Sequence, residues 1–274
     1  MAHVHHYGAD QSLDNVQQRI NLALQDAVAR HSGAMLGVHL GGRTPAEVMG
    51  QIRTARVWGV ILDAINQELL GLIQHAGIPA VMVNAWSEGA PFDAILQDNY
   101  LGGFLAARHL IERGHKRIAW FGRVNASCFS RERLAGATAA MTAAGLDLPA
   151  RLRFDVGKRG PEQTALSMLA GPRRPEAVLA LWTDMTLPVV AAARKLKLAL
   201  GRDLDVVGWA IEECYESYRP RFDKGRMPPM ITWKTADLAR MAIARLIERR
   251  DDPDLPLVRI NVATRLREGD IEER

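Results

Sequence analysis

The chain alternates short apolar runs with longer segments in which apolar residues recur every three or four positions. The short runs predict buried strands, and the periodic segments predict amphipathic helices. Strands are predicted at 35–38, 57–62, 79–83, 94–97, 118–121, 151–156, 177–182, 206–207 and near 257–260. Helices are predicted at 12–31, from Pro45 onward behind a Thr44 cap, at 67–75, from Asn99 to Gly114, after Arg131, at 161–169 and at 187–200.

Strands that are separated by helices of this length imply right-handed crossovers and parallel sheets with helices on both faces. So many strands would overfill a single sheet, and the pattern therefore predicts an α/β protein with two doubly wound lobes. The segment 94–97 is expected at an edge of its sheet.

Composition narrows the class of protein. The 274 residues are 48% hydrophobic, which allows a sizeable core, and the formal charge is only +4 with the basic residues dispersed. This favours a solvated surface over a nucleic-acid patch. Cys128 and Cys214 lie far apart without metal-ligand spacing, which indicates reduced thiols. With no membrane-length apolar stretch and no apolar signal core, we expect a cytoplasmic chain without membrane contact and without a cofactor.

Polar residues stand where several predicted strands end, which is where parallel sheets bind ligands. They are Asp98, the loop 123–130, the pair Thr183 and Asp184, and Glu212 with its neighbour Glu213. Carboxylates accept hydroxyl hydrogens, arginine donates two hydrogen bonds at once, and aromatic faces cover C–H surfaces. The pattern therefore predicts a crevice for a small polyhydroxylated molecule.

Five motifs follow one another along the chain: GHKRIA at 114–119, SRERLAG at 130–136, PEAVLALWTD at 175–184, LDVVGW at 204–209 and PPMITW at 228–233. In this order the chain resembles the effector-binding core of lactose-repressor/galactose-repressor (LacI/GalR) transcription regulators. The resemblance implies a periplasmic-binding-protein-like type I fold, in which crossover strands join two lobes. These lobes would comprise 1–112 plus 230–257 and 113–229 plus 258–274.

The resemblance also implies roles for particular residues. Asp98 would contact a sugar or nucleobase, although an Asp at this place also suits a cap for the helix from Tyr100. Arg133 precedes Leu-Ala-Gly, where the family keeps its ligand-binding arginine, and its side chain is expected to point into a solvent-filled crevice. The alternative for Arg133 is an ordinary surface arginine.

Further pocket positions follow from the same resemblance. Phe129, with Ser127 in the loop before it, matches a pocket position, but Phe129 alone suits a core equally well. Thr183 and Asp184 match the family's ligand-contacting pair only in part, and Asp184 also suits a helix cap.

Two departures from the family pattern stand out. The helix-turn-helix headpiece that reads DNA is expected to be absent, because the chain opens almost directly at the expected first strand, HVHHYG at 3–8. DNA contact would then need a headpiece outside this chain. Ala210 stands where the family has an aspartate after the Val-Val-Gly-Trp strand. Glu212 is predicted either to take over that role or to be a solvated loop residue.

Two other features have structural interpretations. The histidines His3, His5 and His6 suit a ragged terminus better than a metal site, because no distant partner completes a ligand set. The segment 69–73, Leu-Leu-Gly-Leu-Ile, has apolar residues around too much of a helix for one core, which together with the resemblance suggests a homodimer. Leu187 and Val190 are weaker candidates for such a contact.

The predicted function is effector sensing: a sugar, sugar derivative, nucleoside or purine enters between two lobes and changes DNA binding by a dimer. A transporter's solute-binding receptor is an alternative, but it would need an export signal. A sugar- or nucleotide-processing enzyme is a second alternative. The chain has no GxxxxGK[ST] loop, GxSxG elbow or plausible cysteine–histidine pair, and we therefore expect no enzyme.

Overall fold

A computed structural model describes residues 1–5, 16–63, 66–124, 127–157, 159–222 and 225–270. The chain divides into two compact units, each assembled from two stretches: unit 1 is Met1–Gln97 with Lys234–Val262, and unit 2 is Asp98–Trp233 with Ala263–Arg274. Each unit holds one mostly parallel sheet with helices on both faces, so the predicted α/β fold is confirmed. The boundaries lie elsewhere than predicted, because the helix after Asp98 and the strand before Lys234 both belong to unit 2.

The sheet of unit 1 has the strand order β11-β5-β4-β3-β1-β2, and its neighbouring strands run parallel to one another. Because β5 lies between β11 and β4, the prediction of an edge strand at 94–97 is wrong. The central strands are buried on both faces, which explains their continuous apolar runs. The strands are β1 (Ala2–His5), β2 (Leu36–His39), β3 (Val60–Asp63), β4 (Ala80–Val83), β5 (Asp93–Gln97) and β11 (Arg259–Val262).

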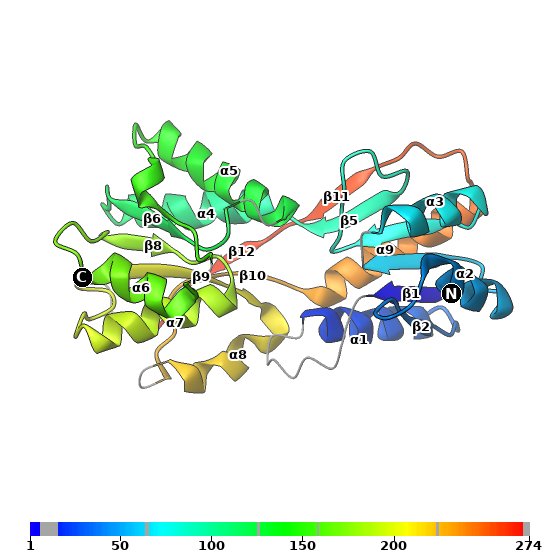
Figure 1. Ribbon diagram of the computed structural model, residues 1–274, viewed down its shortest axis with the longest axis horizontal. Coiled ribbons are helices and arrows are strands. Elements are labelled where there is room, and N and C mark those ends of the chain that lie inside the picture. Colours follow the sequence, from blue (N-terminus) through cyan, green and yellow to red (C-terminus); the bar gives the residue numbers. More distant parts are fainter. Residues whose placement is uncertain (6–15, 64–65, 125–126, 158, 223–224, 271–274) are drawn as a thin grey trace. The chain divides into compact units, whose positions relative to one another are not determined.

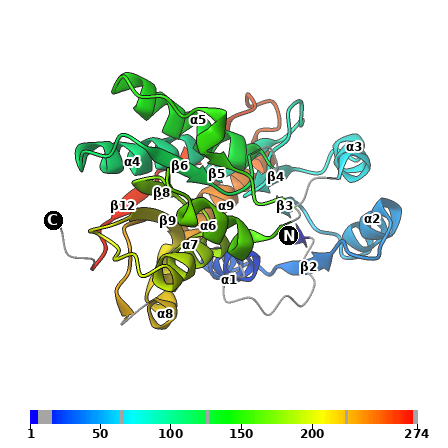
Figure 2. The same cartoon turned by 60° about the vertical axis from the view of Figure 1, so that its left-hand side comes forward.

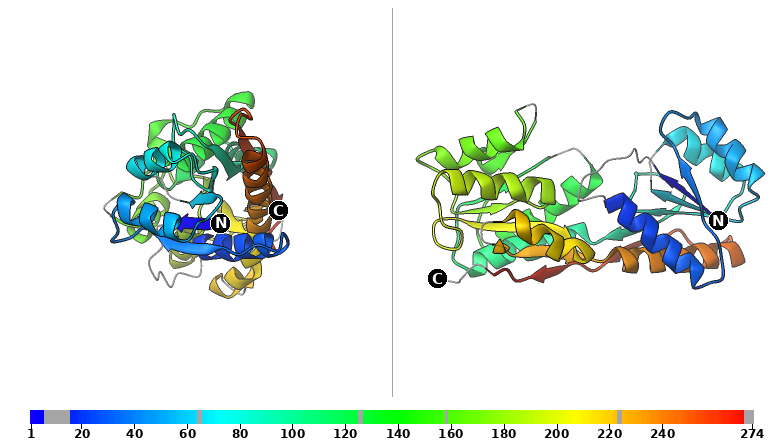
Figure 3. Two further views of the ribbon diagram at one scale, coloured as in Figure 1. Left: turned by 90° about the vertical axis from the view of Figure 1, so that its right-hand side faces the viewer. Right: turned by 90° about the horizontal axis from the view of Figure 1, so that it is seen from below.

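Four helices cover this sheet in the described part of unit 1: α1 (Val16–Ala29), α2 (Pro45–Thr54), α3 (Gln67–His75) and α9 (Thr235–Asp251). α1 packs against α9 (Figure 3), and α2 and α3 lie together away from them (Figure 2). Thr44 caps α2 in a capping box with Glu47, as predicted.

The proposed dimer surface on α3 is not supported by its burial. Leu69, Leu70 and Ile73 are all buried within the protein, and only Leu72 is half-buried. One core therefore covers most of this helix, and the argument from its apolar residues is wrong.

The amino-terminal histidines are part of the sheet rather than of a ragged terminus. His3 is fully buried in β1, and its Nδ1 lies 2.9 Å from Asn21 Oδ1. Burial lowers the pKa of His3 to about 4, although the hydrogen bond to Asn21 opposes this shift. His5 packs its ring against those of His3 and His39; His6 lies outside the described residues. Within the described ranges no cluster of residues suits a metal ion.

A buried carboxylate ties α9 to the sheet. Asp93 on β5 is fully buried and accepts hydrogen bonds from the guanidinium groups of Arg245 and Arg249 and from the backbone N–H of Val258. Both arginines stand on the last turns of α9. The three charged side chains fix the helix and the chain entering β11 to the same strand.

The sheet of unit 2 has the order β12-β10-β9-β8-β6-β7, and only β12 is antiparallel. Helices α4 and α5 lie on one face and α6 and α7 on the other (Figure 1). The strands are β6 (Ile118–Phe121), β7 (Arg153–Phe154), β8 (Ala177–Leu179), β9 (Asp205–Ile211), β10 (Met230–Trp233) and β12 (Arg265–Arg267). The helices are α4 (Asn99–Glu112), α5 (Cys128–Ala143), α6 (Pro161–Ala170), α7 (Thr183–Lys195) and α8 (Tyr215–Tyr218).

Helices α4 and α5 cross at glycines. A Cβ on Gly103 would lie 2.0 Å from the carbonyl oxygen of Arg133, and a Cβ on Gly136 would lie 1.9 Å from the carbonyl oxygen of Tyr100. No real side chain fits at such distances, so the backbones touch directly. This close crossing draws α4 into unit 2.

At the amino end of β9, Asp205 is mostly buried and contacts the side chains of Arg113 and His115. Arg113 Nε donates to Asp205 Oδ2 over 2.9 Å, and His115 Nε2 lies against the same oxygen. Burial alone would raise the pKa of Asp205, but the hydrogen bonds from His115 and Arg113 outweigh it and lower the pKa to about 2.

This carboxylate should make stability depend on pH. A carboxyl whose pKa is lowered on folding stabilises the protein above its unfolded pKa of about 4 and loses that effect as pH falls through about 2. We expect Asp205→Asn to be less stable than wild type by on the order of 1–2 kcal/mol above pH 5. Urea unfolding from pH 5 to pH 2 should show this difference shrinking. A difference that stays constant or grows toward pH 2 would contradict the charge assignment.

No helix in the described ranges is long and apolar enough to cross a membrane.

Candidate functional site

The side chain of Arg133 is the centre of a buried polar cluster in unit 2. It lies on the second turn of α5 and is only 3% exposed. Its Nε donates to Asn99 Oδ1 over 2.8 Å, and its Nη1 donates to the carbonyl oxygen of Leu181. The guanidinium carbon lies 3.6 Å from the ring centre of Trp209 and 4.8 Å from that of Trp182.

The prediction that Arg133 points into a solvent-filled crevice is therefore wrong. Burial lowers the pKa of Arg133 to about 9, while the nearby carboxylates of Asp184 and Glu132 raise it. The guanidinium remains protonated at neutral pH and is stabilised by two indole faces. Placing the cation here required the close crossing of α4 and α5, because it brings Asn99 on one helix to Arg133 on the other.

Thr183 holds the start of α7 to the neighbouring strand. Its Oγ1 donates to the carbonyl oxygen of Trp209 over 2.7 Å, and the side chain is buried. The hydroxyl hydrogen is therefore already used within the protein. The Trp182 indole also makes an edge contact with Trp120, with 5.6 Å between the ring centres, which orients one of the two indoles that flank the guanidinium.

Two predicted acids lie at helix starts next to this cluster. Asp98 caps α4, since its Oδ1 accepts from the backbone N–H of Leu101 over 2.8 Å, and it is half-buried. Asp184 is in the first turn of α7. Partial loss of water raises the pKa of Asp184, although Arg123 and Arg133 oppose the shift.

Ser127 and Glu212 form hydrogen bonds elsewhere, and Phe129 is only half-buried. Ser127 caps α5 by accepting from the backbone N–H of Ser130 over 3.2 Å, and Phe129 is half-buried on the first turn of that helix. Glu212 follows β9 and pairs with Arg267 over 2.7 Å. Ala210 lies inside β9 rather than after it, because the strand continues to Ile211.

The cluster includes three residues that were not predicted as site residues: Asn99, Trp182 and Trp209. Asn99 was predicted only as the start of a helix. Each tryptophan ends an apolar run of a predicted strand, and that position was a usable signal. A held cation, two aromatic faces and adjacent carboxylates form a set that suits hydroxyl groups and C–H faces of one small molecule.

Comparisons with known proteins give the class of this two-unit α/β chain. The family model of the periplasmic binding protein-like domain matches residues 107–270. The ribose operon repressor of Escherichia coli is 32% identical over 201 residues, which cover 71% of this chain and 58% of the repressor. The chain thus spans under two thirds of that relative's length.

Solved structures agree on the fold. A regulatory protein of the LacI family from Chloroflexus aggregans superposes with a TM-score of 0.85 at 19% identity, over 100% of this chain and 98% of the other. The transcriptional regulator CelR in complex with cellobiose gives 0.81 at 21% identity, over 99% and 84%. This chain belongs to the periplasmic binding protein-like domain family, and its resemblance to the effector-binding core of LacI/GalR regulators is confirmed.

Proposed function

We propose that this chain is the effector-sensing part of a LacI-type transcription regulator, and that a sugar or related polar metabolite binds in unit 2 beside Arg133. The observation that carries the proposal is the guanidinium held between Trp209 and Trp182 by Asn99 and the Leu181 carbonyl. The half-buried Trp182 supplies an apolar wall for the C–H face of a sugar ring, and the held guanidinium supplies a charged donor for a hydroxyl. Asp98 and Asp184 are the proposed acceptors.

The remaining parts of the proposal rest on relatives. The repressor and the cellobiose-bound regulator named above support a non-enzymatic sensor with a sugar effector. Control of DNA would act through a headpiece that is not part of the described chain, and the sensing unit would work as a homodimer. A solute-binding receptor is a second candidate, since the matching family is named for periplasmic binding proteins.

A thermal-shift screen tests the proposal directly. Ribose, cellobiose, sugar acids, nucleosides and purines are added in turn, and a ligand at 100 times its Kd should add about 2.7 kcal/mol to the free energy of unfolding. Calorimetry of the hit then gives the affinity and a stoichiometry near one. If sugars have no effect while a purine stabilises, the effector class is different; if a hit is chemically converted, the protein is an enzyme.

Asp98→Asn should weaken binding of the hit by roughly tenfold or more, because a charged acceptor becomes a neutral one. The fold should survive, since asparagine caps helices as well as aspartate does. Calorimetry compares it with Asp252→Asn, a carboxylate that also accepts from a backbone N–H, beyond the end of α9. Equal affinities of Asp98→Asn and wild type would leave Asp98 with its capping role alone.

A further inference from the structure

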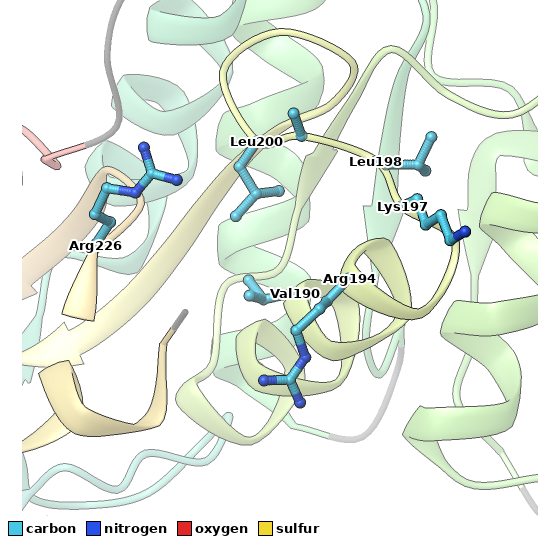
Figure 4. A pocket seen from close by; sticks show the side chains of 7 residues that line it. Val190, Arg194, Lys197, Leu198, Leu200 and Arg226 are labelled. Atoms are coloured by element: carbon cyan, nitrogen blue, oxygen red, sulfur yellow. The ribbon is translucent and has the colours of Figure 1, made fainter. Parts of the chain in front are cut away.

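A hollow in unit 2, away from Arg133, has the composition of a ligand site. It has a volume of about 260 Å³ and lies between the carboxyl-terminal half of α7, the loop after it and the segment before β10. Val190, Leu198 and Leu200 form its apolar surface, and Arg194, Lys197 and Arg226 supply its charge. In Figure 4, Arg226 and Arg194 lie on different sides, with Leu200 and Val190 between them.

The charge of this hollow is unbalanced. Arg194, Lys197 and Arg226 are exposed, and no hydrogen bond or ion pair joins their side chains to any described residue. No acidic side chain in the described ranges lines the hollow. Asp203 is bound nearby to the backbone N–H of Ala199, but its carboxylate is paired with Arg202. Three cations around one small concavity concentrate positive potential there.

A purely structural account covers only part of this arrangement. Arg194 stands in the last turn of α7, where a cation is favourable beside free carbonyl groups. That effect falls off within one turn, and it does not explain Arg226, which comes from a separate segment across the hollow.

Another hollow of unit 2 shows what a structural arginine cluster looks like in this chain. It is lined by Arg113, Arg117, Arg174 and Arg202 among others, and it carries its own carboxylates. Arg117 pairs with Glu176, and Arg202 pairs with Asp203. In that hollow the protein's own carboxylates pair with the arginines. In the hollow beside α7 no carboxylate of the described residues does so.

We propose that the hollow beside α7 binds a small organic anion, with a carboxylate between Arg194 and Arg226 and an apolar body against Val190, Leu198 and Leu200. Guanidinium groups bind carboxylates by charge-assisted hydrogen bonds, and an apolar body is needed because the surface between the two arginines is hydrocarbon. The volume suits a molecule of one or two rings rather than a peptide. The proposal is independent of the effector site, because no hydrogen bond, ion pair or ring contact within the described ranges joins these residues to Arg133.

Binding of 2-naphthoate tests the proposal, with uncharged 2-naphthamide as the comparison and fluorescence titration as the measurement. Naphthoate should bind saturably at one site, and naphthamide at least tenfold more weakly. Arg226→Gln and Arg194→Gln should each weaken naphthoate binding about tenfold, which corresponds to the loss of one charge-assisted contact. Arg117→Gln, in the acid-balanced hollow, should leave it unchanged.

Three outcomes would overturn the proposal: no saturable binding of naphthoate, equal binding of naphthamide, or the same affinity in wild type and Arg226→Gln. Far-ultraviolet circular dichroism of each variant checks that the fold is retained, and all three substitutions lie on exposed side chains. The hit sugar from the effector screen should bind Arg226→Gln as it binds wild type. Loss of both ligands in that variant would likewise count against a separate site.

Discussion

The Gly136→Ala substitution should destabilise unit 2 by about 3 kcal/mol or more, although it adds a single methyl group. That methyl would lie 1.9 Å from the carbonyl oxygen of Tyr100, and the obstacle is backbone that cannot rotate away. The helices α4 and α5 must separate, which costs the packing between them. Because Asn99 and Arg133 stand on these two helices, ligand binding should fall as well. Urea unfolding followed by circular dichroism gives the loss of stability.

Gly71→Ala is the matched control. Gly71 also lies inside a helix, but a Cβ there meets nothing within 4 Å. Alanine should stabilise this helix by roughly 0.5–1 kcal/mol, since it loses less conformational entropy than glycine. If both variants changed stability in the same direction, helix propensity and not the close crossing would govern Gly136.

The Asp93→Ala substitution should be as damaging in unit 1, with an expected loss of about 3–5 kcal/mol. It would leave Arg245 and Arg249, 9% and 11% exposed at their side chains, without the carboxylate that both contact. Removing one member of a buried charge cluster is costly because the remaining charges lose their partner but stay away from water. Thermal unfolding monitored by circular dichroism should show the change.

Glu112→Ala removes a carboxylate from the exposed pair with Arg108 on α4 and should change stability little. Both variants remove a carboxylate that pairs with arginine, but only Asp93 is buried. The difference between their losses of stability therefore measures the effect of burying the charged groups. A small effect for Asp93→Ala would mean that Arg245 and Arg249 reach solvent when the acid is absent.

The sequence correctly predicted helices and strands that are marked by a capping residue or by a short apolar run. The range 67–75 matches α3 and the range 118–121 matches β6, because one has a capping residue and the other is a short apolar run. α7 begins at Thr183, four residues before the predicted start. Pro188 lies inside this helix, whereas proline is expected only in the first turn, so the local pattern placed the start of the helix too late. α9 was not predicted: its buried face is rich in alanine and its mean hydropathy is low.

The sequence predicted only those site residues that follow a predicted strand or match the family pattern. Thr183 and Asp184 do open a helix directly after Trp182, and Arg133 does lie near the start of α5, on its second turn. The burial of Arg133 depends on Gly103 and Gly136, which bring another helix within contact distance, and on two indoles, one from β9 and one from the residue before α7. Such an environment arises from tertiary packing, which no local pattern encodes.

The order of the strands has a consequence for synthesis on the ribosome. β11 completes the sheet of unit 1 and β12 completes that of unit 2, yet both come from residues 259–267, after every other strand of the two sheets. β5 and β10 therefore lack their last neighbours until residues 259–267 have been translated. A nascent or truncated chain that ends before Arg259 exposes one unpaired, apolar strand edge in each sheet, and such edges pair with other chains. Loss of residues 259–267 should thus harm both sheets at once and lead to aggregation rather than to one intact unit.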